Sequence, residues 1–377
     1  MFIRAYLAAL GVAMAVSSSA AAQDIVIGLS APITGPAATA AVWERWGVDI
    51  ALDEINGAGG LLGRKVEIMS LDNRCNPAEA VNVANKLVEA KVAAVIGAHC
   101  SSATLAAMPI IKDAKIPMIT GVSTSPKITE LSGVGGNDWM FRFNPSDQDM
   151  MDALGIYLGK HTNFKKIAVI AEDTDFGRGG VDAFIPAAKK NGLSLISTDF
   201  YPQNQPDFTS ILTRVQQSRP DAIALFQLGG DQINFLRNAM QLGIKIPYTG
   251  RAELGGKNVQ FIEAGGMEGS IGAWFYSADI DTPQNKAFVA ATQKRFNSIP
   301  YLQTWHGYDS VKILAQAIKE AGSAEPAKIQ AALKKVSYLD VMGETMRFDD
   351  HNQAGKTVVI QQVKDRKITV VELLELK

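Results

Sequence analysis

Short apolar segments and longer segments with helical periodicity alternate along this chain, and this alternation limits the fold more than any other feature. In the first part, strands are expected at residues 24–29, 65–71, 92–97 and 116–120, and helices at 43–56, at 78–90 and directly after Ser102. Short strands that alternate with helices of about ten or more residues form βαβ units, which build a parallel sheet. The pattern therefore predicts an α/β fold.

The same alternation starts again after residue 144. Here helices are expected at 147–160, 179–191, 208–217 and after residue 231, and strands at 166–171, 193–199, 221–226 and 247–249. Two such blocks predict two lobes, each with loops at the carboxyl ends of its strands, which is where open α/β sheets bind ligands. At 377 residues, the chain is also long enough for about two domains.

The C-terminal part is mixed and does not predict a third domain. A strand is expected at 269–276, helices at 283–296, 304–321 and 326–335, and short β-rich segments at 346–349, 357–364 and 368–373.

The overall charge excludes two classes of partner. The chain has 37 Lys and Arg against 38 Asp and Glu, for a formal net charge of −1. Without a positive field, the chain does not attract nucleic acid or anionic lipid through its charge. Neither is therefore an expected partner.

The N-terminus has the three parts of a secretory signal peptide. Arg4 supplies a positive charge, residues 5–16 are apolar, and small residues follow up to Ala22. The apolar part is too short to span a bilayer, and the A-x-A pattern before Gln23 is typical of a cleavage site. We therefore expect a signal peptide at 1–22 and export to the periplasm. Because no cysteine lies at the cleavage site, a lipid anchor is not expected.

The two cysteines, Cys75 and Cys100, are each expected just after a strand of the same parallel sheet. An even number of cysteines in an exported protein indicates a disulfide bond. Such a bridge would stabilise the fold by roughly 3 kcal/mol. Two free thiols or a shared metal ion are the alternatives, although no histidine at ligand spacing supports the metal.

Two polar turns are candidate binding elements. One, at 101–104, is rich in serine and precedes a helix, and the other, at 121–125, follows the strand at 116–120. Backbone N–H groups at a helix N-terminus, together with hydroxyl groups, are suited to a carboxylate or another anion. The alternative is an ordinary N-cap, in which Ser101 or Ser102 accepts a hydrogen bond from its own helix.

The sequence contains no recognisable motif for catalysis or for a metal ion. The first βα turn contains APITGP and not G-x-G-x-x-G, and no G-x-S-x-G is present. The acidic turn at 172–175 lacks the twelve-residue loop of a calcium site. We therefore expect no enzyme, cofactor or metal site. The histidines are scattered and are expected to be surface residues or hydrogen-bonded structural residues: His99, His161, His306 and His351.

A series of motifs covers the chain from Asp24 to its C-terminus. In order, they are IGLSAPITGP, ALDEINGAGGLLGRKVEI, DNRCNPAEAVNVANKLV, VIGAHCSSAT, PMITGVSTSP, FRFNPSDQ, EDTDFGRG, WHGYDSVKILAQAI and VMGETMRFD. With these motifs, the chain resembles the type I periplasmic binding proteins, and within them the branched-chain amino acid (leucine, isoleucine and valine) binding group of ABC importers. Individual glycine-rich pieces are weak signals, but their order over the whole mature chain is specific.

The resemblance implies two Rossmann-like lobes joined by a three-strand hinge, with the ligand in the cleft between them. Residues 23–143 plus 275–347 would form lobe 1, and residues 144–274 plus 348–377 would form lobe 2. The implied function is that of a periplasmic, monomeric binding protein without a cofactor. It would close on a small carboxylate, most of all a branched-chain or other aliphatic amino acid, and present it to a membrane permease. The bridge between Cys75 and Cys100 is also a trait of the family.

The resemblance also implies roles for individual residues. Ser101 and Thr124 match the family positions that take the ligand's α-carboxylate, and the carbonyl group of Val122 matches the one that receives the ammonium group. Phe176 matches an aromatic residue that covers the ligand. Ser102 and Ser123, in the same two turns, complete the predicted site.

The chain departs from the family pattern at three positions. Two family tyrosines fall on Ala40, where Trp43 is the nearest aromatic residue, and on Leu228. The acidic residue that pairs with the ligand's ammonium group falls on Ala252, one residue before Glu253. If Glu253 takes that role, the ligand has an amine; otherwise it is an amine-free carboxylate. The loss of two tyrosines would widen the site for an aromatic or longer acid.

Other interpretations remain for several of these features. Trp43 and Trp46 could belong to the core of a helix, and Tyr276 could pack at the end of a strand. In addition to transport, the same fold could report its ligand to a periplasmic sensing partner.

Overall fold

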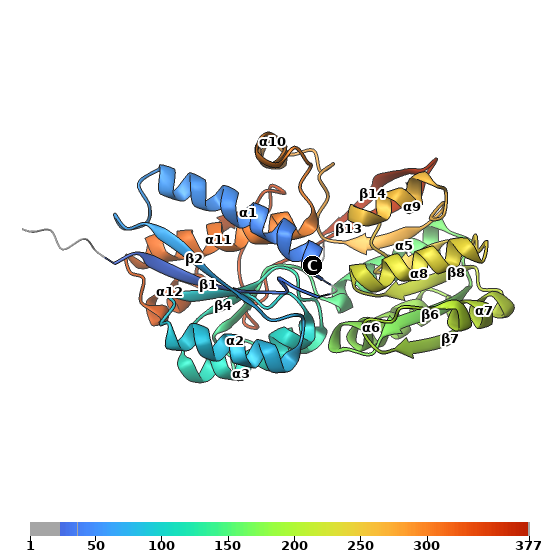
Figure 1. Ribbon diagram of the computed structural model, residues 1–377, viewed down its shortest axis with the longest axis horizontal. Helices are drawn as coiled ribbons and strands as arrows, with labels where there is room; N and C mark the ends of the chain where they lie inside the picture. Colours follow the sequence, from blue (N-terminus) through green and yellow to red (C-terminus); the bar gives the residue numbers. More distant parts are fainter. Residues whose placement is uncertain (1–22, 36, 376–377) are drawn as a thin grey trace, which may run out of the picture.

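The computed structural model describes residues 23–35 and 37–375, so the expected signal peptide at 1–22 lies outside the described residues. The described residues form two lobes, each built on a parallel sheet (Figure 1). The expected α/β fold class is confirmed. In this part of the chain, none of the helices combines the length and the apolar character that a membrane crossing requires.

The first lobe is built on five parallel strands in the order β2-β1-β3-β4-β5. They are β1 (Ile25–Ala31), β2 (Val66–Asp72), β3 (Ala94–Gly97), β4 (Met118–Thr120) and β5 (Met140–Arg142). Helices cover both faces of this sheet, with α1 (Ala38–Gly57) and α11 (Leu302–Ala321) on one and α2 (Pro77–Glu89) and α3 (Ser101–Ala114) on the other (Figure 1). Because both faces are covered, all residues of the central β3 are buried.

Helices α1 and α11 approach each other very closely at two glycines. A Cβ atom on Gly47 would lie 1.9 Å from the carbonyl oxygen of Thr304, and one on Gly307 would lie 2.1 Å from that of Glu44. Only glycine permits this contact between the two backbones. The contact brings Glu44 of α1 next to His306 of α11.

The second lobe is built on four parallel strands in the order β7-β6-β8-β9. They are β6 (Lys166–Glu172), β7 (Ser194–Tyr201), β8 (Ala222–Phe226) and β9 (Tyr248–Gly250). Successive residues of β6 belong to different cores: Val169 packs with α5 (Asp147–His161) and α6 (Asp175–Lys190), and Ile170 packs with α7 (Thr209–Ser218) and α8 (Gly229–Gln241). This alternation is expected of a strand with helices on both faces.

The C-terminal part contributes to both lobes. The strands β10 (Ile271–Trp274), β13 (Thr357–Lys364) and β14 (Lys367–Glu375) form an antiparallel sheet beside the second lobe, whereas α11 and α12 (Pro326–Leu333) belong to the first (Figure 1). The remaining elements are α4 (Pro126–Glu130), η1 (Gly256–Asn258), α9 (Val259–Glu263), α10 (Pro283–Phe296), β11 (Tyr338–Leu339) and β12 (Thr345–Met346).

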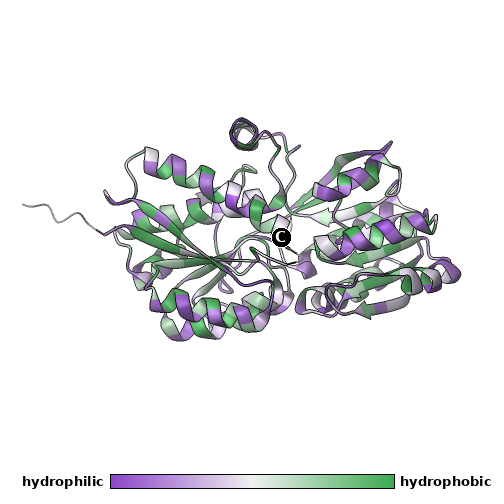
Figure 2. Ribbon diagram, viewed as in Figure 1, coloured by the Kyte–Doolittle hydropathy of each residue, from purple (hydrophilic) through white to green (hydrophobic). Residues whose placement is uncertain are grey.

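Apolar residues gather in the strands and on the helix sides that face them, and hydrophilic residues lie on the outer helix sides (Figure 2).

Three expected segment bounds were wrong. Helix α1 begins at Ala38 and not at residue 43, because the small residues before Trp43 give no periodic signal. Helix α6 begins at Asp175, where the Thr174 hydroxyl caps it by accepting the N–H of Gly177. The strand expected at 346–349 is only the short β12, paired with β11.

Candidate functional site

Residues from both lobes line a cavity of about 170 Å³ at the carboxyl ends of the two parallel sheets. One water molecule occupies roughly 30 Å³ in the liquid, so the cavity has room for a small organic molecule. Seven of the eight predicted ligand-binding residues line it: Trp43, Ser101, Ser102, Val122, Thr124, Phe176 and Glu253. Ser123 does not, because its hydroxyl is turned into the fold, where it donates to the carbonyl oxygen of His99 (2.8 Å).

Ser101 stands at the first turn of α3 and connects the two polar turns. Its hydroxyl oxygen accepts hydrogen bonds from the N–H groups of Thr124 and Ser125, both at 3.2 Å. Because both bonds use lone pairs, the hydroxyl hydrogen of Ser101 remains available to a ligand in the cavity.

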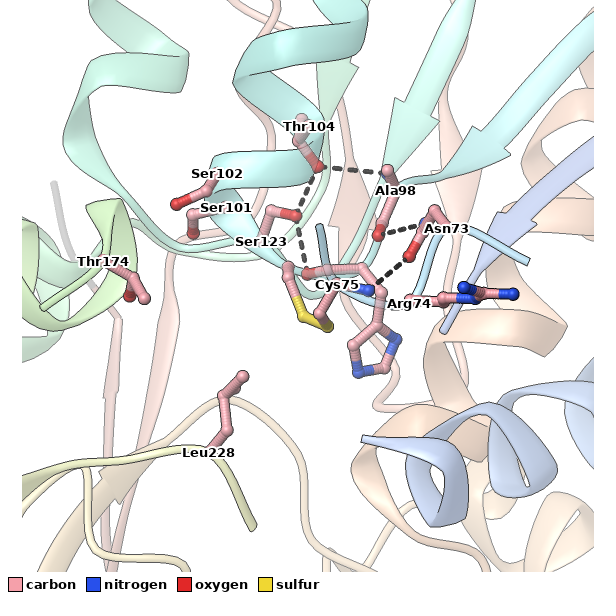
Figure 3. The surroundings of a disulfide bond; sticks show 12 residues. Asn73, Arg74, Cys75, Ala98, Ser101, Ser102, Thr104, Ser123, Thr174 and Leu228 are labelled. Carbon is pink, nitrogen blue, oxygen red and sulfur yellow. Dashed lines mark hydrogen bonds between the residues drawn. A yellow bond between two sulfur atoms is a disulfide. The ribbon is translucent and has the colours of Figure 1, made fainter. Parts of the chain in front are cut away.

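The alternative in which Ser101 or Ser102 caps α3 was wrong. Cys100 occupies the N-cap position, and no side chain caps the helix there. The nearby hydroxyl groups bond elsewhere: the Thr104 hydroxyl accepts the N–H of Ala98 (3.0 Å) and lies 2.7 Å from that of Ser123 (Figure 3). The first turn of α3 thus keeps its positive end facing the cavity without a side-chain cap, as a carboxylate site requires.

Thr124 is hydrogen-bonded to a buried ion pair, Asp147 and Arg251. Its hydroxyl donates to one carboxylate oxygen of Asp147 (2.8 Å), and the other accepts from Nη1 of Arg251 (2.8 Å). Neither charged residue is more than 2% exposed. Burial raises the pKa of Asp147 and lowers that of Arg251, and their mutual attraction opposes both shifts. The hydroxyl hydrogen of Thr124 is therefore committed to Asp147.

Arg251 directly follows β9 and lines the cavity. Its guanidinium lies 4.3 Å from the ring centre of Trp274 and within 6 Å of the rings of Phe176 and Phe275. Such faces hold an arginine by cation–π attraction. Among the described residues, the Nε of Arg251 has no hydrogen-bond partner. The second lobe thus contributes a fixed cation to the cavity wall.

Glu253 is the only acidic side chain of the cavity that has no hydrogen-bond partner among the residues described. Its backbone is fixed, because the amide of Gln232 accepts from its N–H and donates to its carbonyl oxygen, both at 2.9 Å. Burial raises the pKa of the Glu253 carboxyl to about 7. A carboxyl group held in this way gains most from a cation supplied by the ligand.

Aromatic side chains close the cavity from both lobes. Phe176 lies in the first turn of α6, and Trp43 lies in α1, where it stacks on Tyr301 with 4.1 Å between ring centres. Trp46 instead packs on Phe296 (4.7 Å). Tyr276 is buried and donates to the Asn285 side chain (3.0 Å), so both of these residues have structural roles.

The disulfide bond between Cys75 and Cys100 is present, and both cysteines line the cavity (Figure 3). Asn73 accepts the N–H of Cys75 through its side chain (2.9 Å), and donates to the Ser30 hydroxyl and to the carbonyl oxygen of Ala98. The expected bridge is confirmed, which excludes the free thiols and the shared metal ion.

The acidic turn after β6 has other roles than metal binding. Glu172 accepts from the Thr174 hydroxyl (2.8 Å), Asp173 pairs with Arg178, and Asp175 starts α6. Burial raises the pKa of Glu172 to about 7. Within residues 23–35 and 37–375, no group of three potential metal ligands is found.

The family model for periplasmic binding proteins matches residues 24–367, which is most of the chain. The chain belongs to this family. Proteins of this kind bind solutes and catalyse no reaction, which agrees with a cavity lined by binding groups.

Curated relatives of this binding protein match over nearly their whole length. The leucine-, isoleucine-, valine-, threonine-, and alanine-binding protein of Pseudomonas aeruginosa is 28% identical over 365 residues, which cover 93% of this chain and 96% of that protein. The leucine-specific-binding protein of Salmonella typhimurium is 30% identical over 325 residues, which cover 86% of each chain.

Solved structures share the fold. The branched-chain amino acid transporter substrate binding protein LivJ of Streptococcus pneumoniae, in complex with isoleucine, has a TM-score of 0.83 at 25% identity and covers 94% of this binding protein and 100% of its own chain. A solute binding protein of an ABC transporter from R. palustris, in complex with benzoate, has a TM-score of 0.84 at 20% identity. The match covers 93% of this binding protein and 96% of that chain. The second likeness concerns the fold alone.

Two of the three expected departures from the family pattern fall at this site. Ala40 and Leu228 line the cavity of this binding protein, with small or aliphatic side chains where the resemblance implies tyrosines. Ala252 is fully buried and does not line it. Of the two adjacent residues, only Glu253 reaches the cavity.

The sequence reasoning missed Arg251 and a buried cluster around Glu44. The position of Arg251 directly after a short strand is the signal that could have indicated it. Glu44 accepts from His99 and His306, both at 3.0 Å. These two histidines were expected to be hydrogen-bonded or on the surface, and they are buried and bonded.

Proposed function

We propose that this binding protein is the extracytoplasmic component of an ABC importer that closes on a small amino acid. The observation that carries the proposal is the unpaired carboxylate of Glu253 in the same cavity as the Ser101 hydroxyl and the uncapped start of α3. An anion site beside a carboxylate that lacks a cation is complementary to a zwitterion.

The roles follow from these groups. The ligand's carboxylate would accept from Ser101, from the first turn of α3 and from Arg251, and Thr124 would act through Asp147 to hold Arg251 in place. The ammonium group would bind Glu253 and the carbonyl oxygen of Val122. Phe176 and Trp43 would cover the ligand from the two lobes.

Branched-chain and other aliphatic amino acids are the first ligands to test, because the relatives are named for leucine, isoleucine, valine, threonine and alanine. Delivery to a membrane permease, a periplasmic location and a monomeric state belong to the same proposal. So do the lobe boundaries, with residues 23–143 plus 275–347 moving as one body against 144–274 plus 348–377.

An amine-free carboxylate is the second candidate, and the buried Arg251 favours it. With an unpartnered Nε and aromatic rings around it, Arg251 could bind a carboxylate without help from an ammonium site. The short side chains of Ala40 and Leu228 would leave space for a longer or aromatic acid.

Calorimetric titration distinguishes the two candidates. The mature chain, residues 23–377, would first be unfolded and refolded to remove any bound ligand, and then titrated with each amino acid and with its amine-free analogue. We expect binding of an amino acid, and a loss of about tenfold or more in the Glu253→Gln variant, because a charged hydrogen bond is removed. Glu263→Gln, an exposed glutamate, is the matched control. Binding of amine-free acids alone would establish the second candidate.

A further inference from the structure

One titratable group of the cavity wall has no role in the site described so far. His99 lines the cavity next to the disulfide, yet it is only 6% exposed. Its Nδ1 is bonded to Glu44, and no partner of Nε2 is found among the described residues. Nε2 is thus the ring nitrogen of His99 that remains for a ligand.

The backbone holds His99 in an uncommon conformation. Its φ angle is +70°, in the left-handed region that residues other than glycine seldom adopt. Its carbonyl oxygen accepts from the Ser123 hydroxyl, which fixes the turn. Such conformations persist where the surroundings impose them, and they concentrate at functional sites.

The hydrogen bonds around Glu44 determine where the protons of the two histidines lie. Glu44 has no exposed surface and is hydrogen-bonded to both His99 and His306, at 3.0 Å each. In His306, Nδ1 accepts the N–H of Gly121 (3.0 Å), and therefore carries no proton. The ring proton of His306 is then on Nε2, which donates to Glu44.

A buried group of side chains without net charge is the least costly arrangement, and no lysine or arginine of the described residues is bonded to Glu44. In a Glu44–His99 pair without net charge, one proton lies between the Glu44 carboxyl group and Nδ1 of His99, and a second is on Nε2. His99, which lines the cavity, therefore has an N–H group for a ligand.

Some residues that line the same cavity as His99 take no part in the proposed carboxylate and ammonium sites. They include the disulfide and Gln303 of the first lobe. Figure 3 shows Leu228 of the second lobe across from the disulfide. A ligand whose charged groups bind Ser101 and Glu253 would place its side chain here.

We infer that His99 donates a hydrogen bond from Nε2 to an oxygen atom of the ligand's side chain, and thus selects amino acids with a carboxylate or amide side chain. This inference rests on the proposed function, and narrows its ligand. An aliphatic side chain would leave this buried N–H group without a partner, which is costly.

Amino acids of equal shape test the inference in the unaltered protein. Leucine has the branched skeleton of asparagine and aspartate, and methionine has the length of glutamine and glutamate. We expect at least one of these oxygen-bearing ligands to bind about tenfold or more tightly than its apolar counterpart, since the apolar ligand leaves the buried N–H group of His99 without a partner. In ¹⁵N spectra of the histidine rings, the resonance of Nε2 of His99 should shift when that ligand is added.

A variant adds a second test. In Glu44→Gln with His99→Leu, the buried charge and its partner are removed together, and the amide introduced into α1 can still accept from His306. We expect this double variant to lose the preference for the oxygen-bearing ligand and to keep leucine affinity within about threefold, whereas His161→Leu, at an exposed histidine, should change neither. The inference would be overturned if leucine and methionine bind more tightly than asparagine, aspartate, glutamine and glutamate, or if the Nε2 signal of His99 does not move. Either result would leave the proposed function intact. If no amino acid binds at all, both are wrong.

Discussion

The hydroxyl oxygen of Ser102, in the first lobe, accepts a hydrogen bond from the backbone N–H of Asp175, in the second, at 3.0 Å. Beside it, Nζ of Lys127 lies 3.2 Å from the Asp175 carboxylate. Gly179 of α6 faces Pro126, where an added Cβ would be 3.2 Å away. These contacts join the start of α3 and α4 to the start of α6 along one side of the cavity. Opening the cleft about a hinge would break them.

Removal of the Ser102 hydroxyl should therefore weaken ligand binding without unfolding either lobe. In Ser102→Ala, we expect a loss of about two- to tenfold in affinity, because a single neutral hydrogen bond contributes about 0.5–1.5 kcal/mol and this one stabilises only the closed state. The measurement is calorimetric titration together with the melting temperature of the ligand-free protein. Ser210→Ala, at an exposed serine of α7, is the control. A Ser102→Ala variant with unchanged affinity would mean that closure does not depend on this contact.

Loss of the disulfide should lower stability and disturb the site together. The bridge joins cysteines 25 residues apart in sequence, so replacement of Cys75 and Cys100 by alanine is expected to cost about 3 kcal/mol of unfolding free energy. Because Cys100 is the N-cap of α3, ligand affinity should fall as well. Urea unfolding with and without reductant, with the double variant as control, measures the effect. Reductant should not change the stability of the variant.

Local patterns were enough to predict the alternation of strands and helices in two lobes and the polar turns of the first lobe. The family resemblance added the site residues of the second lobe, and long-range pairing was not predictable. The strand at 92–97 and the turn after it are contiguous in sequence, so the position of Ser101 at a sheet edge follows from local pattern alone. Arg251 and Asp147 are 104 residues apart, and Glu44 and His306 are 262 apart. Residues so far apart in sequence leave no periodic signal that would pair them. The helix contact at Gly47 and Gly307, which brings Glu44 and His306 together, depends on tertiary packing.

The ion pair of Asp147 and Arg251 should be strongly coupled. In Asp147→Asn, the buried Arg251 would lose its charge partner, and breaking one side of such a pair costs about 3–5 kcal/mol. In Asp147→Asn with Arg251→Met, no charge is left behind, so most of that stability should return. Urea unfolding of the ligand-free proteins gives both values. Additive losses in the double variant would contradict the coupling that the 2.8 Å contact implies.

The pH dependence of binding should report Glu253. Its pKa of about 7 in the ligand-free cavity is raised by burial, and a ligand ammonium group favours the ionised form. Affinity for an amino acid should therefore be constant above pH 7 and fall by about tenfold per pH unit below it, as protonated Glu253 must first ionise. Amine-free acids should not show this fall.

For folding, the same raised pKa has the opposite consequence. Between about pH 4.3, the ordinary glutamate value, and about 7, the folded ligand-free protein binds more protons at Glu253 than the unfolded chain does. This group's contribution to stability therefore decreases as the pH rises through that window.

Glu253→Gln should remove both pH effects. Glu172 also has a pKa raised to about 7, but its carboxylate is bonded to Thr174, so Glu172→Gln should keep the pH dependence of binding. A profile abolished by Glu172→Gln and kept by Glu253→Gln would transfer the ammonium site to Glu172.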